Sequence, residues 1–255
     1  MIVHASDTAE QMGEAAAGHA AASIRALSER FDVVPVVFAT GASQLRTLRA
    51  LVNIPDIPWD RVIGFHMDEY VGISKEHKAS FRRYLRDELT SRIAIREFHE
   101  VDGEAADPGE FCRCYAELLK QWRPQLCLLG IGENGHLAFN DPPVADFDDP
   151  KDVKLTYLDA ACREQQVAEG WFASVDEVPP QAITLTIPAL LRIPELIISV
   201  PGERKRRIVE RTLNEEISTA CPATILRTHP NAHLYLDAAS RSAAGTGTQF
   251  GKTIG

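Results

Sequence analysis

Short apolar runs alternate with amphipathic stretches along most of the chain. In the first amphipathic stretch, apolar residues recur every three or four positions, which predicts a helix from about residue 7 to residue 30. Asp7 precedes this stretch and Glu10 follows three positions later, a spacing typical of a capping box at a helix start. The same periodicity predicts further helices over about residues 45–52, 81–92, 111–122 and 208–213.

Runs rich in β-branched residues predict buried strands between these helices. They cover residues 33–39, 62–65, 126–129, 183–187, 196–200 and 232–236. Strands that alternate with helices are typical of a mostly parallel sheet with helices on both faces. The sequence therefore predicts a doubly wound, three-layer αβα fold of the Rossmann-like class. Because no linker divides residues 1–255, we expect a single domain.

Residues 126–142 contain the most informative break in this pattern. An apolar run leads into Gly130-Ile-Gly-Glu-Asn-Gly135, which is followed by His136 and Asp141. Glycines at a strand end allow the backbone to approach a ligand closely. In an open α/β sheet, ligands bind beyond the carboxyl ends of the strands. A histidine held there by a carboxylate can transfer protons at neutral pH.

The same glycines have two other interpretations. They match the GxGxxG pattern of dinucleotide-binding proteins, but that pattern requires a continuous helix after the last glycine. Here Pro142 and Pro143 end any helix almost at once, because proline cannot continue it. The second alternative is a tight turn without a ligand, in which His136 only caps the turn.

A second strand end carries Thr40, Gly41, Ala42 and Ser43. Small residues here expose backbone N–H groups, the following helix start adds positive potential, and two hydroxyls add donors. This combination suits a phosphate group. An ordinary turn with a serine cap is the alternative.

Charged residues mark two more strand ends. Asp68 and Glu69 follow one strand, and a carboxylate there could serve as a general base. Adjacent residues of an extended segment point to opposite sides, so we expect at most one of them to face the cleft. Lys205 begins a helix after a later strand, where a positive charge is unfavourable unless an anion lies nearby. A solvated acidic loop and a solvated lysine are the respective alternatives.

Composition restricts the classes of function. The net charge of −9 and the pI near 5.4 argue against nucleic-acid or membrane-surface binding. A local cluster of amides and cations can still bind a small anion in such a protein. The five cysteines show no metal-binding spacing, and no signal peptide is evident, so we expect a cytoplasmic protein with reduced cysteines. No histidine spacing supports a catalytic metal, so none is expected.

Several segments together resemble the glucosamine-6-phosphate deaminase/isomerase family, whose superfamily includes 6-phosphogluconolactonases. The matching segments are Phe65–Gly72, Gly130–Asp141 and Val200–Lys205, and Ser80-Phe81 and Pro222–His229 fit the family as well. The resemblance covers nearly the whole chain. The Met-Asp-Glu-Tyr and Gly-His-Leu-Ala-Phe-Asn elements favour the deaminase branch of the superfamily.

The resemblance implies conversion of glucosamine 6-phosphate and water to fructose 6-phosphate and ammonia, without a cofactor. It implies that Asp68 moves a proton between C2 and C1 of the opened sugar and that His136 assists ring opening. Thr40 to Ser43 and Lys205 match the phosphate-binding segments of the family. Glu69 and Gly135 belong to the matching motifs and are expected to contact the substrate as well.

The sequence departs from the family pattern at the ring-opening residues. Asn134 stands where the deaminases carry aspartate, and Asp141 stands where they carry glutamate. Asparagine can orient a ring nitrogen but cannot accept a full proton. We assign both residues to the catalytic group, and the changes leave open which amino-sugar phosphate is preferred.

Two further segments depart from the family. No arginine between Gln165 and Phe172 matches a further phosphate contact, and Arg163 is out of register with it. Residues 142–144 replace small hydroxyl residues of an allosteric phosphate site, so we do not expect that regulation.

Three functions follow from the sequence. The first is an amino-sugar-phosphate deaminase, which we prefer because Asp68 and His136 would both lie in the cleft. The second is a 6-phosphogluconolactonase-like hydrolase, which Tyr70 and the Phe139-Asn140 pair fit poorly. The third is a non-catalytic sugar-phosphate sensor, suggested by Asn134. The expected partner is a small sugar phosphate, and a homo-oligomer is compatible with the sequence.

Overall fold

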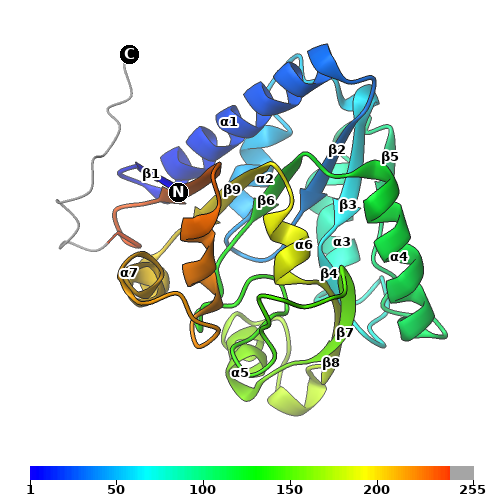
Figure 1. The fold of residues 1–255 in the computed structure, drawn as a ribbon, viewed down its shortest axis with the longest axis vertical. Helices are drawn as coiled ribbons and strands as arrows, with labels where there is room; N and C mark the ends of the chain where they lie inside the picture. Colours follow the sequence, from blue (N-terminus) through cyan, green and yellow to red (C-terminus); the bar gives the residue numbers. More distant parts are fainter. Residues whose placement is uncertain (242–255) are drawn as a thin grey trace.

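A seven-stranded parallel sheet in the order β1-β10-β9-β6-β2-β3-β5 forms the centre of the protein (Figure 1). The computed structural model describes residues 1–241, so the single-domain prediction for residues 1–255 includes a segment outside the described residues. The strands are β1 Ile2–Ala5, β2 Val34–Phe38, β3 Val62–His66, β5 Glu97–His99, β6 Leu126–Leu129, β9 Glu195–Val200 and β10 Ala232–Leu236. Helices cover both faces of this sheet, which confirms the three-layer αβα fold.

Two apolar cores lie on opposite faces of the sheet. Successive residues of one strand contribute to different cores, because side chains alternate along a strand: Phe38 packs on one face and Val37 on the other. Helices α1 Ala9–Arg30, α2 Leu45–Leu51 and α3 Phe81–Leu85 cover the first face. Helices α4 Pro108–Trp122, α6 Ile187–Leu191 and α7 Arg206–Asn214 cover the second. No helix within residues 1–241 is long and apolar enough to cross a membrane.

A second, antiparallel sheet lies beside the first. Its order is β4 Asp68–Tyr70, β8 Gln181–Leu185 and β7 Val153–Tyr157. The strand predicted at residues 183–187 is therefore β8, which pairs outside the parallel sheet, and its last predicted residue begins α6. Strand β4 follows β3 after only Met67, so the chain passes directly from one sheet into the other. Asp68 lies at this junction.

Two predicted helices differ in detail from the structure. Helix α1 is capped by Thr8 and Gln11 rather than by Asp7 and Glu10: the Thr8 Oγ1 accepts from the Gln11 N–H at 3.1 Å, and the Gln11 Oε1 accepts from the Thr8 N–H at 3.2 Å. Threonine and glutamine satisfy the same capping rule one position later. The helix predicted over residues 81–92 is divided into α3 and a π-helical turn over residues 86–90.

Candidate active site

A pocket of about 460 Å³ opens beyond the carboxyl ends of β2, β3, β6, β9 and β10. The loops that follow these strands supply most of its lining. Its volume is in the range of small-molecule sites. The pocket lies where the sequence predicted, at the edge where the parallel strands end.

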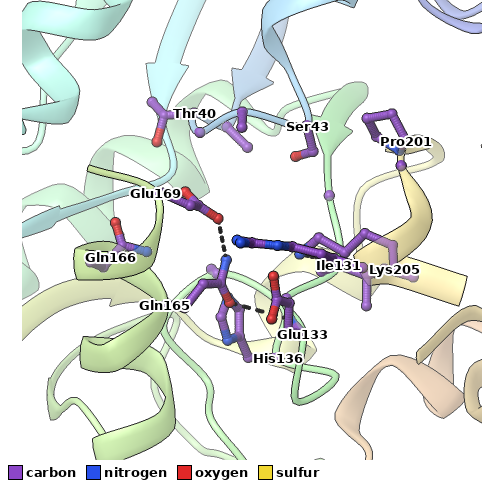
Figure 2. A pocket seen from close by; sticks show the side chains of 18 of the residues that line it. Thr40, Ser43, Ile131, Glu133, His136, Gln165, Gln166, Glu169, Pro201 and Lys205 are labelled. Carbon is purple, nitrogen blue, oxygen red and sulfur yellow. Dashed lines mark hydrogen bonds between the residues drawn. The ribbon is translucent and has the colours of Figure 1, made fainter. Parts of the chain in front are cut away.

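The loop after β2 forms one side of the pocket, as Figure 2 shows for Thr40 and Ser43. Gly41 adopts a φ of +86°, a conformation that favours glycine, and its carbonyl accepts from the Tyr84 hydroxyl at 3.0 Å. A side chain at Gly130 would place its Cβ 2.4 Å from the Ser43 Oγ. The first glycine of the central motif therefore lets the loops after β2 and β6 pack against each other.

Asp68 lines the pocket and is only 6% exposed. Burial, together with the neighbouring Glu69 carboxylate, raises the pKa of Asp68 to about 8. A carboxyl group with a pKa near neutral can take up and release a proton under physiological conditions, as a general base requires.

Glu69 points away from the pocket. Its carboxylate is fully buried and accepts from the Ser80 hydroxyl at 2.8 Å and from the backbone N–H groups of Arg82 at 2.9 Å, Tyr70 at 3.0 Å and Phe81 at 3.1 Å. It thereby holds the first turn of α3. The expected alternation of the two acids is present, but the expected substrate contact of Glu69 is not supported, because its oxygens bind α3 instead.

His136 lines the pocket from the loop after β6. A Cβ at Gly132 would lie within 2.3 Å of three atoms of the imidazole, so only glycine leaves room for the ring. The His136 Nδ1 lies 2.9 Å from the Asp141 Oδ1. Burial alone would raise the pKa of Asp141, but His136 and Asn134 outweigh it, and the pKa is lowered. Asp141 is therefore an ionised partner that can orient the ring.

Asn134 connects His136 to two acids. Its Oδ1 accepts from the backbone N–H of His136 at 3.0 Å, and its Nδ2 donates to the Asp141 Oδ1 at 2.9 Å and to the Asp159 Oδ2 at 3.3 Å. Neither Asn134 nor Asp141 is among the residues that line the pocket. Both residues predicted as catalytic instead contact His136, Asn134 at its backbone and Asp141 at its ring.

Replacing Asn134 with aspartate should destabilise this chain, although the resemblance implies aspartate at this position. The new carboxylate would lie against Asp141 and Asp159 and would lose the amide that now donates to both. We expect a loss of about 1–3 kcal/mol in the free energy of unfolding, measured by urea denaturation. Adding Asp159→Asn removes one of the carboxylates next to the new one and should recover part of the lost free energy of unfolding. Asparagine at position 159 should itself cost little, because it also caps a helix. An unchanged unfolding midpoint in Asn134→Asp would contradict this account.

Gly135 does not line the pocket, so its predicted substrate contact is not supported. Its φ is +92°, and a Cβ there would lie 2.9 Å from the Cys221 Sγ. Gly135 therefore packs the turn against the segment before β10.

Lys205 lines the pocket from the start of α7. Its Nζ donates to the Ile131 carbonyl at 2.8 Å, which holds the ammonium group over the loop after β6. Burial lowers the pKa of Lys205, while the carboxylates of Glu169 and Glu133 oppose that shift. The preceding turn is fixed by Gly202, whose N–H donates to both oxygens of Asp237 at 3.1 Å.

Helix α5 Ala160–Ala168 and the turn after it supply pocket residues that the sequence did not indicate: Gln165, Gln166 and Glu169. The Gln165 Nε2 donates to the Glu169 Oε1 at 2.7 Å, and its Oε1 accepts from the Glu133 N–H at 3.3 Å (Figure 2). The resemblance placed a further phosphate contact between Gln165 and Phe172, but through an arginine that this chain lacks, so these three polar residues were not expected.

The charges of the pocket are mixed. Arg46 and Arg204 join Lys205 in the lining, while Glu133 and Glu169 add carboxylates. One group in this region has metal-ligand atoms within 4.8 Å of one another, namely His136, Asp141 and Cys162. Burial raises the pKa of the Cys162 thiol well above its ordinary value, so it stays protonated and is a poor ligand.

Comparisons with known proteins agree with this arrangement. The family model described as glucosamine-6-phosphate isomerases/6-phosphogluconolactonase matches residues 7–235. A glucosamine-6-phosphate deaminase from Exiguobacterium sp. is 33% identical over 71% of this chain and 69% of its own length. A glucosamine-6-phosphate deaminase from Staphylococcus aureus is 34% identical over 73% of this chain and 74% of its own.

Solved structures show the same relationship. A monomeric glucosamine-6-phosphate deaminase superposes with a TM-score of 0.85 at 26% identity, covering 94% of this chain and 98% of that one. A 6-phosphogluconolactonase described as putative, from Neisseria gonorrhoeae, shares the fold with a TM-score of 0.74 at 18% identity, covering 93% and 99%. The chain therefore belongs to the glucosamine-6-phosphate isomerase/6-phosphogluconolactonase family.

Proposed function

We propose that this protein is a glucosamine-6-phosphate deaminase, which converts glucosamine 6-phosphate and water to fructose 6-phosphate and ammonia. The observation that carries the proposal is the placement of Asp68 and His136 on one pocket, each with an environment suited to proton transfer. The deaminases among the relatives support the same reaction.

Different residues of the pocket can bind the phosphate and transfer the protons. The loop at Thr40 to Ser43 and the Lys205 ammonium offer donors and positive charge for the phosphate. Anchoring the phosphate makes its binding energy available to orient the reacting carbons. His136, held through Nδ1 by Asp141, can use its Nε2 to move a proton at the ring oxygen and open the ring. Asp68 then carries a proton between C2 and C1 in an enediol-type aldose–ketose transfer.

The acidic groups of the pocket favour an amino sugar over a lactone. Glu133 and Glu169 line the same pocket as the cationic residues. A substrate with a phosphate and an ammonium group can satisfy both sets of charges, whereas a 6-phosphogluconolactone carries no cation. This charge pattern supports the deaminase over the hydrolase.

The decisive experiment measures ammonia and fructose 6-phosphate released from glucosamine 6-phosphate by the purified protein. Galactosamine 6-phosphate and 6-phosphogluconolactone serve as parallel substrates. Equal amounts of ammonia and ketose from glucosamine 6-phosphate are expected. Turnover of only galactosamine 6-phosphate or only 6-phosphogluconolactone would show that the protein has the related activity for that substrate instead. Tight binding of glucosamine 6-phosphate without any turnover would instead identify a sensor.

The proposal extends to the cellular location, the cofactor requirement and the oligomeric state of the enzyme. We expect a cytoplasmic enzyme of amino-sugar catabolism, including that of N-acetylglucosamine, and the five free cysteines support this location. The proposed reaction needs no cofactor, because each step is a proton transfer or an exchange of ammonia and water. A homo-oligomer is compatible with the sequence, while the relative described as monomeric supports a single chain.

A further inference from the structure

A cluster of three histidines and one glutamate lies away from the pocket, on the face of the sheet that α1 covers. His4 comes from β1, His19 from α1, His233 from β10 and Glu195 from the first position of β9. Figure 1 shows β1 beside α1 at this edge of the sheet. Elsewhere the same face is packed with apolar side chains, so a polar cluster here needs its own explanation.

The donor atoms of the cluster are close together. The His19 Nε2 lies 3.0 Å from the Glu195 Oε1, and the His4 Nε2 lies 3.0 Å from the His233 Nδ1. Ligand atoms of His19, Glu195 and His233 all lie within 4.8 Å of one another. A tetrahedral zinc ion with bonds of about 2.0–2.1 Å holds its ligand atoms roughly 3.3 Å apart. The two short pairs therefore already have the spacing of metal ligands, and a small contraction would complete the set.

The outer nitrogens of two rings are held by neighbouring groups. The His233 Nε2 lies 2.8 Å from the Asn231 Oδ1, an acceptor, which leaves the Nδ1 lone pair directed toward the cluster. The His19 Nδ1 lies 2.7 Å from the Tyr235 hydroxyl. That hydroxyl can donate or accept, so the His19 proton can move from Nε2 to Nδ1 when a cation replaces it. Such outer contacts orient the histidine ligands of metal sites.

Glu195 supplies the only carboxylate of the four groups, which is a ligand set typical of zinc rather than of magnesium or calcium.

We propose that His19, His233 and Glu195, with His4 as the fourth group, form a binding site for a divalent transition metal, with zinc as the preferred ion. The ion would join β1, α1, β9 and β10. Because β1 is a four-residue strand at the edge of the sheet and pairs with β10, a metal bond would add a connection from this strand to α1 and β9. The site is structural, since it shares no residue with the pocket.

The distance from the pocket makes this site separately testable. Ala9 lines the pocket and His19 lies ten residues further along α1, about 15 Å away. Asp237 lines the pocket and His233 lies four residues before it, about 13 Å along the strand. Loss of the metal should therefore leave the reaction chemistry unchanged.

The test is equilibrium dialysis of the full chain against Zn²⁺, together with thermal unfolding at increasing Zn²⁺ and the visible spectrum with Co²⁺. We expect one high-affinity Zn²⁺ per chain, a rise in Tm of about 5 °C or more at saturation, and a tetrahedral cobalt spectrum. His19→Ala and His233→Ala should lose this binding. Tyr235→Phe should weaken it about 10- to 100-fold through loss of the outer contact.

Controls separate the cluster from other sites. His99→Ala is the matched variant, because His99 is half-buried and its Nε2 lies 3.4 Å from the Glu97 carboxylate without a second imidazole. It should bind Zn²⁺ as the unmodified protein does. Glu195→Gln keeps the shape of the cluster and should lose affinity for Zn²⁺. This variant keeps the test available if the alanine variants fail to fold. Equal zinc binding in the unmodified protein and in folded His19→Ala or Glu195→Gln would overturn the proposal. A thiolate–cobalt absorption band would also overturn it, because it would place the ion at a cysteine, and the proposed cluster contains none.

Discussion

Asp68→Asn should lower turnover of glucosamine 6-phosphate by about 10²- to 10⁴-fold, the usual contribution of a general base. The amide has nearly the same shape as the carboxyl group but cannot accept the C2 proton. Because no other part of the pocket changes, affinity for the substrate should stay within a few-fold. Steady-state kinetics and direct binding of fructose 6-phosphate measure the two effects separately.

The same substitution should stabilise the protein. The pKa of Asp68 is raised from 3.8 to about 8 in the folded state, so folding carries a cost for this group. That cost is absent below the unfolded pKa, grows as the pH rises from about 4, and reaches its full value near pH 8. Asparagine removes it, so the Tm of Asp68→Asn should exceed that of the unmodified protein by several degrees at pH 8. The difference should shrink toward zero near pH 4.

The pH dependence of activity should follow the same group. A base is active when deprotonated, so kcat/KM should rise about tenfold per pH unit below pH 8 and level off above it. Asp148→Asn, which changes an exposed carboxylate outside the pocket, is the control and should alter neither activity nor the pH profile. Full activity in Asp68→Asn would show that another group transfers the proton.

The sequence predicted the parts of this structure that depend on local patterns. The apolar runs that became β2, β3, β6, β9 and β10 are buried on both faces, and such strands appear as uninterrupted hydrophobic segments. Because these strands are parallel, their carboxyl ends meet at one edge. The positions of Asp68, His136 and Lys205 on one pocket follow from that single fact.

The elements that were not predicted depend on tertiary contacts. Strands β1, β5 and β7 are short or partly exposed, and β4 is three residues long, so none of them forms a distinct apolar run. The pairing of β8 with β4 and β7 could not be read from residues 181–185, because an apolar strand does not specify its neighbours. Helix α5 was not predicted because its nine residues carry few large apolar side chains. The resemblance pointed to the segment that contains Gln165 and Glu169, but through an arginine that this chain lacks.

Glu69 shows where motif membership misleads. It forms an adjacent acidic pair with Asp68 and was expected to contact the substrate. The extended backbone of β4 sends adjacent side chains to opposite sides, and the start of α3 offers one hydroxyl and two backbone N–H donors on the far side. A residue in a catalytic motif can thus serve only to hold the helix beside the site.

Lys205→Met should weaken substrate binding and leave the chemical step nearly intact. Methionine keeps the length of the side chain but removes the charge and the hydrogen bond to the Ile131 carbonyl. A charged hydrogen bond from the ammonium group to the substrate phosphate would contribute about 1.5–3 kcal/mol. Its loss should therefore raise KM by about 10- to 150-fold. If Lys205 holds the phosphate, the inhibition constant of inorganic phosphate should rise by a similar factor.

Arg207→Ala is the matched control for Lys205→Met. Arg207 is a cation two residues further along, exposed and outside the pocket lining, so its loss tests whether general positive charge is enough. We expect KM and phosphate inhibition to change less than about twofold in this variant, because exposed charges are screened by salt. If KM stayed constant in Lys205→Met, the phosphate would have to bind elsewhere in the pocket. If KM rose equally in both variants, long-range attraction of the anionic substrate would explain the effect, and the ammonium group of Lys205 would have no specific contact with the phosphate.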